Sequence, residues 1–349
     1  MEYIFRAGCR VRAFVRIPRQ IMTILADGSF RYEVCPDWAQ LPAEVRLGDV
    51  AAVGVDRHDR VYLFTRGEHP MIVLDRDGHV LRTWGHGLFK HAHGLHIAPD
   101  DTLYCTDDGD HTVRRCTSEG RLLLQIGVPG EPAAFMGGLP FHACTHTALS
   151  PRGELYVSDG YGNACIHKFA PDGRRLKTWG RSGCAPGEFY IPHNIVCDAD
   201  GWVYVADREN HRVQVFDGEG RYETQWNNLH RPCALCTSSG TTPLFYVGEI
   251  GPAMRATLNF PNIGPRLVIL DNQGRQLARL AGGPAGIGPG RFIAPHGMAL
   301  DSHGDLYVSD VAYTAWPAFF PDTPVPARLP TLHKLRRLGP ATPTFDTAP

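Results

Sequence analysis

The stretch HNIVCDADGWVYVADRENHRVQVFDGEGRYETQW, residues 193–226, carries the pattern from which the fold is inferred. It reads as four short runs of β-branched and aromatic residues, separated by turns rich in Asp and Gly. Alternating apolar residues between such turns are the sequence signature of β-hairpins. The stretch therefore predicts one antiparallel sheet of four strands.

The same pattern recurs along the chain. Related stretches begin at Val53, His93, Thr145 and His296, and a degenerate copy, PCALCTSSGTTPLFYVGE, begins at Pro232. A repeat of roughly 45–50 residues with four strands per unit is typical of a propeller blade. Six units fit residues 45–340, so we predict an all-β fold, a six-bladed β-propeller with four-stranded blades. Residues 1–44 form an N-terminal segment whose part around 30–38 is expected to help close the ring, and residues 341–349 are predicted to be a disordered tail.

Composition excludes several classes of protein. The net charge is −1 and the pI is about 7.0, without the basic excess of a nucleic-acid-binding protein. No apolar run approaches the roughly 18 residues of a membrane span, and no signal peptide is recognisable. With ten cysteines and no secretion signal, we expect reduced thiols and a cytoplasmic location.

Residues that recur from unit to unit indicate a scaffold role. An aspartate ends the second run in four units, and short acidic side chains commonly bond to turn backbone. These residues are Asp107, Asp159, Asp207 and Asp310.

Three histidines break the repeat. His93, His193 and His296 each begin the first run of a unit, fourteen residues before the recurring aspartate, and they belong to units two, four and six. First strands line a propeller's channel, so alternate blades would bring three imidazoles together around the axis. Three histidines with one open position are typical of a catalytic zinc site, although nickel, copper or iron also suit imidazole. The alternative is that these histidines only cap strands.

Other polar side chains are expected near the same rim. Arg66, Tyr161 and Arg208 follow second runs, which return to the end of the blade where the histidines begin. Arginine offers a two-pronged contact to a carboxylate, and a tyrosine beside a metal and a guanidinium can act as a base. His146 lies one place out of register and is a further catalytic candidate. Alternatively, these are surface turn residues in salt links.

The chain resembles the NHL-repeat propellers and, more closely, the peptidyl-α-hydroxyglycine α-amidating lyase family, over about residues 45–312. The motifs that carry the resemblance are RG at Arg66, HGL at His93, SDGYGN at Tyr161, PH at His193, ADREN at Arg208 and PHG at His296. The resemblance implies zinc on His93, His193 and His296, Tyr161 as the base, and Arg66 and Arg208 around the substrate. The family reaction breaks an N–C bond of a carbinolamide and releases an amide and glyoxylate.

The chain departs from the family at several positions. Gly297 stands where the family's calcium site has an acidic residue, so the sequence does not support Ca²⁺. Ala294 replaces a usual methionine, Gly162 replaces a disulfide cysteine of secreted members, and His146 stands where the family tends to have an acidic residue. No monooxygenase domain is recognisable either. We therefore expect the lyase chemistry on a small molecule carrying a carboxylate or other polar group.

Two inserts, residues 250–265 and 312–330, follow second runs and should overhang the channel mouth. Their apolar residues Met254, Phe260, Trp316, Phe319 and Phe320 predict either a pocket wall or a homodimer contact. Two other functions stay open: a metal-dependent hydrolase of an ester, lactone or amide, and a non-enzymatic NHL scaffold.

Overall fold

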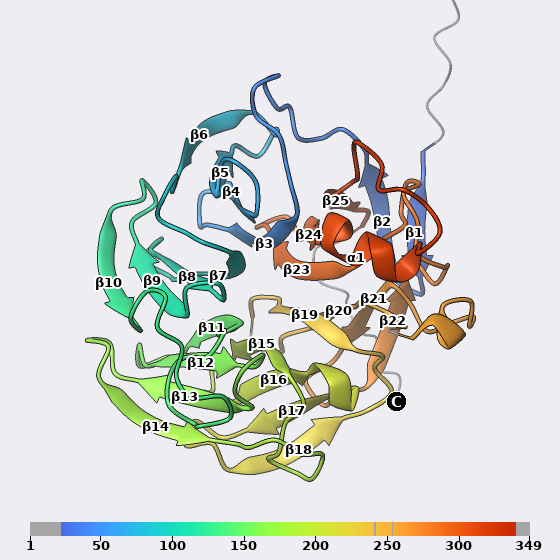
Figure 1. The fold of residues 1–349 in the computed structure, drawn as a ribbon. Coiled ribbons are helices and arrows are strands. Elements are labelled where there is room, and N and C mark those ends of the chain that lie inside the picture. Colours follow the sequence, from blue (N-terminus) through green and yellow to red (C-terminus); the bar gives the residue numbers. More distant parts are fainter. Residues whose placement is uncertain (1–21, 241, 253, 340–349) are drawn as a thin grey trace, which may run out of the picture.

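The computed structural model describes residues 22–240, 242–252 and 254–339. The predicted tail at 341–349 and the first 21 residues of the N-terminal segment lie outside the described residues. Six antiparallel sheets stand around a central axis, as Figure 1 shows, so the prediction of a six-bladed β-propeller is confirmed.

Each of the first five blades has four strands in chain order. Their strands are β3 (Val50–Val55), β4 (Val61–Thr65), β5 (Met71–Leu74) and β6 (Val80–Trp84) in blade 1; β7 (Ala92–Ile97), β8 (Leu103–Asp107), β9 (Thr112–Cys116) and β10 (Leu122–Ile126) in blade 2; β11 (His146–Leu149), β12 (Leu155–Asp159), β13 (Cys165–Phe169) and β14 (Arg175–Trp179) in blade 3; β15 (Pro192–Cys197), β16 (Val203–Asp207), β17 (Arg212–Phe216) and β18 (Tyr222–Trp226) in blade 4; and β19 (Pro232–Thr237), β20 (Phe245–Glu249), β21 (Arg266–Leu270) and β22 (Gln276–Leu280) in blade 5.

The sixth blade joins the two ends of the described chain. It contains β23 (Pro295–Leu300), β24 (Leu306–Asp310) and β25 (Leu332–Arg337), and its outer strands are β2 (Phe30–Cys35) and β1 (Ile24–Asp27). Strand β2 pairs antiparallel with β25, with Val34 opposite Leu335. A strand from the start of the chain thus covers the edge of the last blade, which would otherwise expose unpaired backbone groups.

The first strand of each blade lies innermost. Strands β3, β7, β11, β15, β19 and β23 contact one another in succession around the ring, and β23 returns to β3. In the first five blades the second and third strands are almost entirely buried, because they pack between neighbouring blades. This arrangement brings the starts of the first strands together at one mouth of the channel.

The recurring aspartates anchor the approach to those first strands. Asp310 is fully buried and accepts the backbone N–H groups of Ile293 and Ala294, both at 2.8 Å, just before β23. Asp207 accepts the N–H of Tyr190 at 2.7 Å in the same way. They therefore have the scaffold role that their recurrence predicts.

The two inserts differ in structure. Residues 312–319 form the one α-helix of the described chain, α1 (Ala312–Phe319), which lies beside β23 and β24 (orange-red in Figure 1). The earlier insert contains only a short 3₁₀ turn, η2 (Arg255–Thr257). None of the described helices is long and apolar enough to cross a membrane.

Candidate metal centre

The three channel histidines leave the sheets at identical irregularities. In blade 4, Pro192 pairs with Asp207 and Asn194 with Ala206, so His193 stands unpaired between them. The same shift surrounds His93 and His296. A β-bulge of this kind redirects a side chain, and here it aims each imidazole at the axis.

The imidazole rings form a nearly regular triangle. Their centroids are 4.9 Å apart for His93 and His193 and 4.7 Å apart for each of the other two pairs. One ligand atom from each ring lies within 4.8 Å of the other two, and all three residues are buried. The structure thus brings the three predicted histidines into a single cluster.

Hydrogen bonds select the tautomer of every ring. His93 Nδ1 lies 2.7 Å from the carbonyl oxygen of Thr145, and His193 Nδ1 lies 2.9 Å from that of Cys233. His296 Nδ1 lies 2.7 Å from the carbonyl oxygen of Ala51. A carbonyl only accepts, so Nδ1 carries the proton in each ring and Nε2 keeps its lone pair.

This donor set fits a transition metal. Burial first, and neighbouring histidine and arginine charges second, lower the pKa of His93 and His193 well below the usual 6.5, so the rings stay neutral at physiological pH. Neutral imidazoles whose second nitrogen bonds to a carbonyl are the usual protein ligands of zinc. The residues therefore fit a three-histidine metal site.

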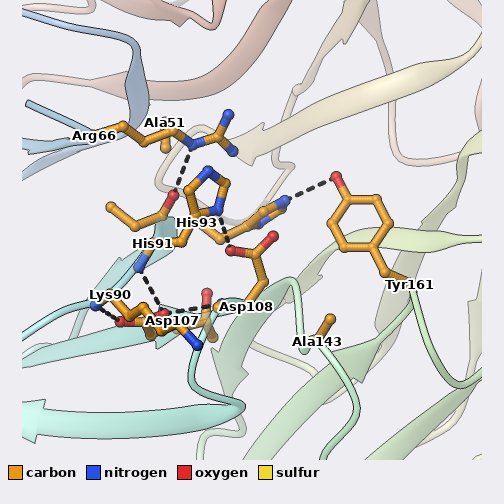
Figure 2. Close-up of polar contacts among 12 residues, drawn as sticks. Ala51, Arg66, Lys90, His91, His93, Asp107, Asp108, Ala143 and Tyr161 are labelled. Atoms are coloured by element: carbon orange, nitrogen blue, oxygen red, sulfur yellow. Dashed lines mark hydrogen bonds and ion pairs between the residues drawn. The ribbon is translucent and has the colours of Figure 1, made fainter. Parts of the chain in front are cut away.

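Tyr161 lies directly against two of these ligands. Its hydroxyl oxygen is 3.0 Å from Nε2 of His93, drawn in Figure 2, and 3.0 Å from Nε2 of His193. Close packing fixes the loop on both sides, because a Cβ on Gly160 would lie 2.3 Å from a backbone oxygen and one on Gly162 would lie 1.9 Å from the His142 ring. Burial raises the pKa of Tyr161, while the charge of Arg208 opposes that rise.

Arg66 and Arg208 occupy one repeat position in two blades. Arg66 directly follows β4, the second strand of blade 1, and Arg208 directly follows β16, the second strand of blade 4. Blades 1 and 4 lie opposite each other in a six-bladed ring. Arg208 Nη1 lies 3.4 Å from the Tyr161 hydroxyl. Arg66 Nε donates to the carbonyl of Ala92 at 3.1 Å, next to His93, as Figure 2 shows.

A third arginine, Arg231, was missed by the sequence analysis. It pairs with Glu209 at 2.8 Å, and Glu209 also pairs with Arg208 at 2.7 Å. Burial alone would raise the pKa of Glu209, but its bonds to Arg231 and Arg208 lower it, so the carboxylate stays ionised. The sequence does contain a pattern that could identify it, because Arg231 stands two residues before Cys233, and Cys233 takes the position of the channel histidines in blade 5.

A cavity of about 310 Å³ adjoins the histidine cluster and reaches His296. Its lining combines three arginines with apolar side chains, some of them from α1. The lining residues are Arg66, Tyr161, Arg208, Arg231, Cys233, Ile250, Pro252, Ala294, His296, Val311, Thr314, Ala315, Ala318 and Phe319. Burial raises the pKa of the Cys233 thiol to about 11, so it lines the cavity as a neutral group.

His146 does not join this cavity. It pairs opposite Ser158 and therefore takes the place that Gly94 has in blade 2, one residue beyond the histidine position. Its Nδ1 lies 2.9 Å from the carbonyl oxygen of Thr147. The structure brings Arg66, Tyr161 and Arg208 to the triad but leaves His146 outside the group of candidate ligands.

Of the apolar insert residues, Phe319 lines the cavity, while Trp316 is buried in the core and packs on Phe320. Met254 and Phe260 are 65% and 58% exposed and do not line it, so this cavity does not support the pocket-wall alternative for these two residues.

A second cluster has metal-like spacing but a structural role. Asp159, Cys165 and His167 are buried together in blade 3. Asp159 already accepts bonds from the backbone N–H of His142 and from the side chain of Asn163, and His167 bonds to Thr178. These contacts satisfy the groups within the blade.

Comparisons with known proteins agree with this architecture. Residues 189–216, in blade 4, match the NHL repeat model. NHL repeat-containing protein 3 of Homo sapiens is 32% identical over 56% of this chain and 60% of that protein. Peptidyl-alpha-hydroxyglycine alpha-amidating lyase 1 of Drosophila melanogaster is 26% identical over 76% of this chain and 50% of that protein.

The chain thus spans less than two thirds of either relative. Among solved structures, a gluconolactonase from Xanthomonas campestris superposes with a TM-score of 0.58 over 89% of this chain and 91% of that chain, at 12% identity. At that identity the match supports the fold alone. The chain is a six-bladed β-propeller that contains an NHL repeat and is similar in sequence to the peptidyl-α-hydroxyglycine α-amidating lyases.

Proposed function

We propose that the protein is a metal-dependent lyase that cleaves the C–N bond of a small N-acyl-2-hydroxyglycine, releasing an amide and glyoxylate. The observation that carries the proposal is the position of Tyr161, whose hydroxyl lies 3.0 Å from Nε2 of both His93 and His193. Sequence similarity to amidating lyases supports it.

The metal is proposed to lie on Nε2 of His93, His193 and His296, with zinc as the first candidate. When bound, it would supply Lewis acidity that makes a substrate hydroxyl easier to deprotonate. Because Nδ1 of each ring is committed to a carbonyl, each ring can turn only Nε2 toward the axis.

The proposed role of Tyr161 is to accept the proton of the substrate hydroxyl. Once a metal holds Nε2 of both histidines, the remaining hydrogen-bond partner of the hydroxyl is the guanidinium of Arg208, at 3.4 Å. Its charge opposes the rise in the pKa of Tyr161 that burial causes, and so helps the oxygen to carry a negative charge. The electrons of the O–H bond form the aldehyde of glyoxylate, the C–N bond breaks, and the proton passes to the amide nitrogen. Atoms and charge balance without water or an oxidant.

The charged side of the cavity suits the carboxylate of such a substrate. Within the described residues, the three guanidinium groups of Arg66, Arg208 and Arg231 form ion pairs with two carboxylates, those of Glu209 and Asp49, so the arginines outnumber their paired carboxylates by one. The paired arginine side chains are 11 to 14% exposed, so water screens them little. A bound carboxylate would complete the charge balance.

The test is to incubate purified protein with N-benzoyl-2-hydroxyglycine and to identify the aromatic product, against a protein-free control. The lyase releases benzamide and glyoxylate in equal amounts. An amide hydrolase instead releases benzoate. Benzoate as the product, or no acceleration over the control with the metal-loaded protein, would reject the proposal.

A further inference from the structure

Helix α1 forms a fixed wall of the cavity. The backbone N–H groups of Tyr313 and Thr314, in its first turn, donate to the buried carboxylate of Asp49 at 2.7 and 3.0 Å. Negative charge at a helix N-terminus is stabilising, and both donors would otherwise lack a helical partner. Strand β3 of blade 1, which follows Asp49, therefore anchors the start of a helix from blade 6.

The chain after α1 secures its other end. The Trp316 indole donates to the carbonyl of Thr323 at 3.0 Å, and its ring packs on Phe320 with centroids 4.2 Å apart. The Tyr313 hydroxyl accepts the backbone N–H of Leu329 at 3.1 Å. These contacts tie α1 to the chain that follows it and keep its side chains in the lining of the cavity.

The surface that α1 turns to the cavity is small and apolar. Ala315, Ala318 and Phe319 line the cavity, together with Ile250 and Pro252 from the loop after β20. The three arginines line the same cavity, and Arg231 also contacts this loop, since its Nη1 donates to the carbonyl of Gly251 at 3.4 Å. The lining therefore combines a cationic pole, the guanidinium groups of the three arginines, with an apolar pole, the side chains of α1 and of the loop after β20.

Helix α1 also touches the cationic pole directly. Arg66 Nη1 donates to the Thr314 hydroxyl at 3.2 Å, and that hydroxyl bonds to Asp49. The same helix thus orients an arginine at one pole and supplies the apolar wall at the other. A ligand that fills both poles must have its anionic and apolar ends a short distance apart.

The volume limits what fits. At about 310 Å³, the cavity is at the lower end of the roughly 300–1,000 Å³ of small-molecule sites. We propose that α1 is the specificity element of this site, and that the substrate is a compact amphiphile, an N-acyl-2-hydroxyglycine with a single small apolar acyl group, rather than a peptide. This inference rests on the proposed function for the 2-hydroxyglycine part and on the cavity for the acyl part.

Non-reactive ligands test the inference by calorimetry, without needing turnover. The probes are glyoxylate, whose carboxylate contacts only the cationic pole; N-benzoylglycine, which lacks the reacting hydroxyl; and N-acetyl-Ala-Ala-Gly, which carries a peptide chain. We expect N-benzoylglycine to bind at least tenfold more tightly than the peptide. Phe319→Ala should weaken N-benzoylglycine at least fivefold and leave glyoxylate unchanged.

Phe260→Ala is the matched control, since Phe260 is exposed and does not line the cavity; it should change neither ligand. Equal binding of N-benzoylglycine and the peptide, with no effect of Phe319→Ala, would overturn the role of α1 while leaving the lyase proposal intact. Failure of glyoxylate to bind the metal-loaded wild-type protein would instead show that the cationic pole does not bind a carboxylate, and would reject the proposed function with it.

Discussion

The Nδ1 atom of His193 lies 2.9 Å from the backbone carbonyl oxygen of Cys233, the residue that takes the same position in the next blade. His296 makes the matching contact with Ala51. Each ligand of the candidate metal centre is thus oriented by the backbone of the neighbouring blade. The centre depends on closure of the ring as well as on three side chains.

Removal of one ligand should therefore empty the site. His193→Ala is expected to reduce zinc affinity by more than the roughly 100-fold that loss of an outer-shell partner costs. Competition with a chromophoric chelator measures that affinity. His146→Ala is the matched control, since it removes another imidazole of an innermost strand that lies outside the ligand cluster. Equal zinc affinity of the His193 variant and the wild type would contradict the assignment.

The role of Tyr161 predicts a split between metal binding and turnover. Tyr161→Phe removes only the hydroxyl, so zinc content should be unchanged while kcat falls about 10²- to 10⁴-fold, the usual contribution of a general base. Tyr190→Phe, at an exposed position, serves as the control. Near-wild-type kcat on N-benzoyl-2-hydroxyglycine in the Tyr161 variant would remove the tyrosine from the mechanism.

The blade aspartates predict a large loss of stability. Asp310→Ala leaves the N–H groups of Ile293 and Ala294 without their acceptor, at a cost of about 1–3 kcal/mol each. Urea unfolding should show a decrease in the free energy of unfolding of roughly 2–6 kcal/mol. Asp200→Ala, at an exposed turn, should change it by less than about 0.5 kcal/mol. A similar small change in the Asp310 variant would show that the backbone bonds find other partners.

Buried neutral histidines predict acid sensitivity of the metal-free protein. Burial lowers the pKa of His93, His193 and His296 well below 6.5. Below pH 6.5 the unfolded chain therefore binds protons that the folded chain does not, and stability falls as the pH falls, by up to about 1.4 kcal/mol per pH unit for each such group.

Denaturant unfolding of the metal-free protein at a series of pH values measures this slope. Above pH 6.5 these three histidines should not make the free energy of unfolding depend on pH. Below pH 6.5 the free energy of unfolding should decrease as the pH falls. Replacing the three histidines by glutamine should make the decrease shallower. An unchanged slope in that variant would show that other groups govern the acid sensitivity.

The repeat made much of the site predictable. A period of four short strands identifies the first strand of each blade, so His93, His193 and His296 could be placed at one mouth of the channel. Arg66 and Arg208 were placed by the same alignment, because each follows a second strand.

Other features depend on details that a repeat does not encode. Arg231 stands in the degenerate fifth unit, where its pairing with Glu209 arises from the fold of a neighbouring blade. His146 is one residue out of phase, and a shift of one position moves a side chain of a strand to the other face. Phe260 and Phe319 are both insert aromatics, and only the formation of α1 places Phe319 at the cavity.

Metal content, measured on protein produced without a histidine tag, tests the central claim most directly. Elemental analysis should find close to one transition-metal ion per chain in the wild type, removable by a chelator, and none in a variant with His93, His193 and His296 all changed to alanine. A folded wild-type protein that holds no metal after incubation with zinc would contradict the account.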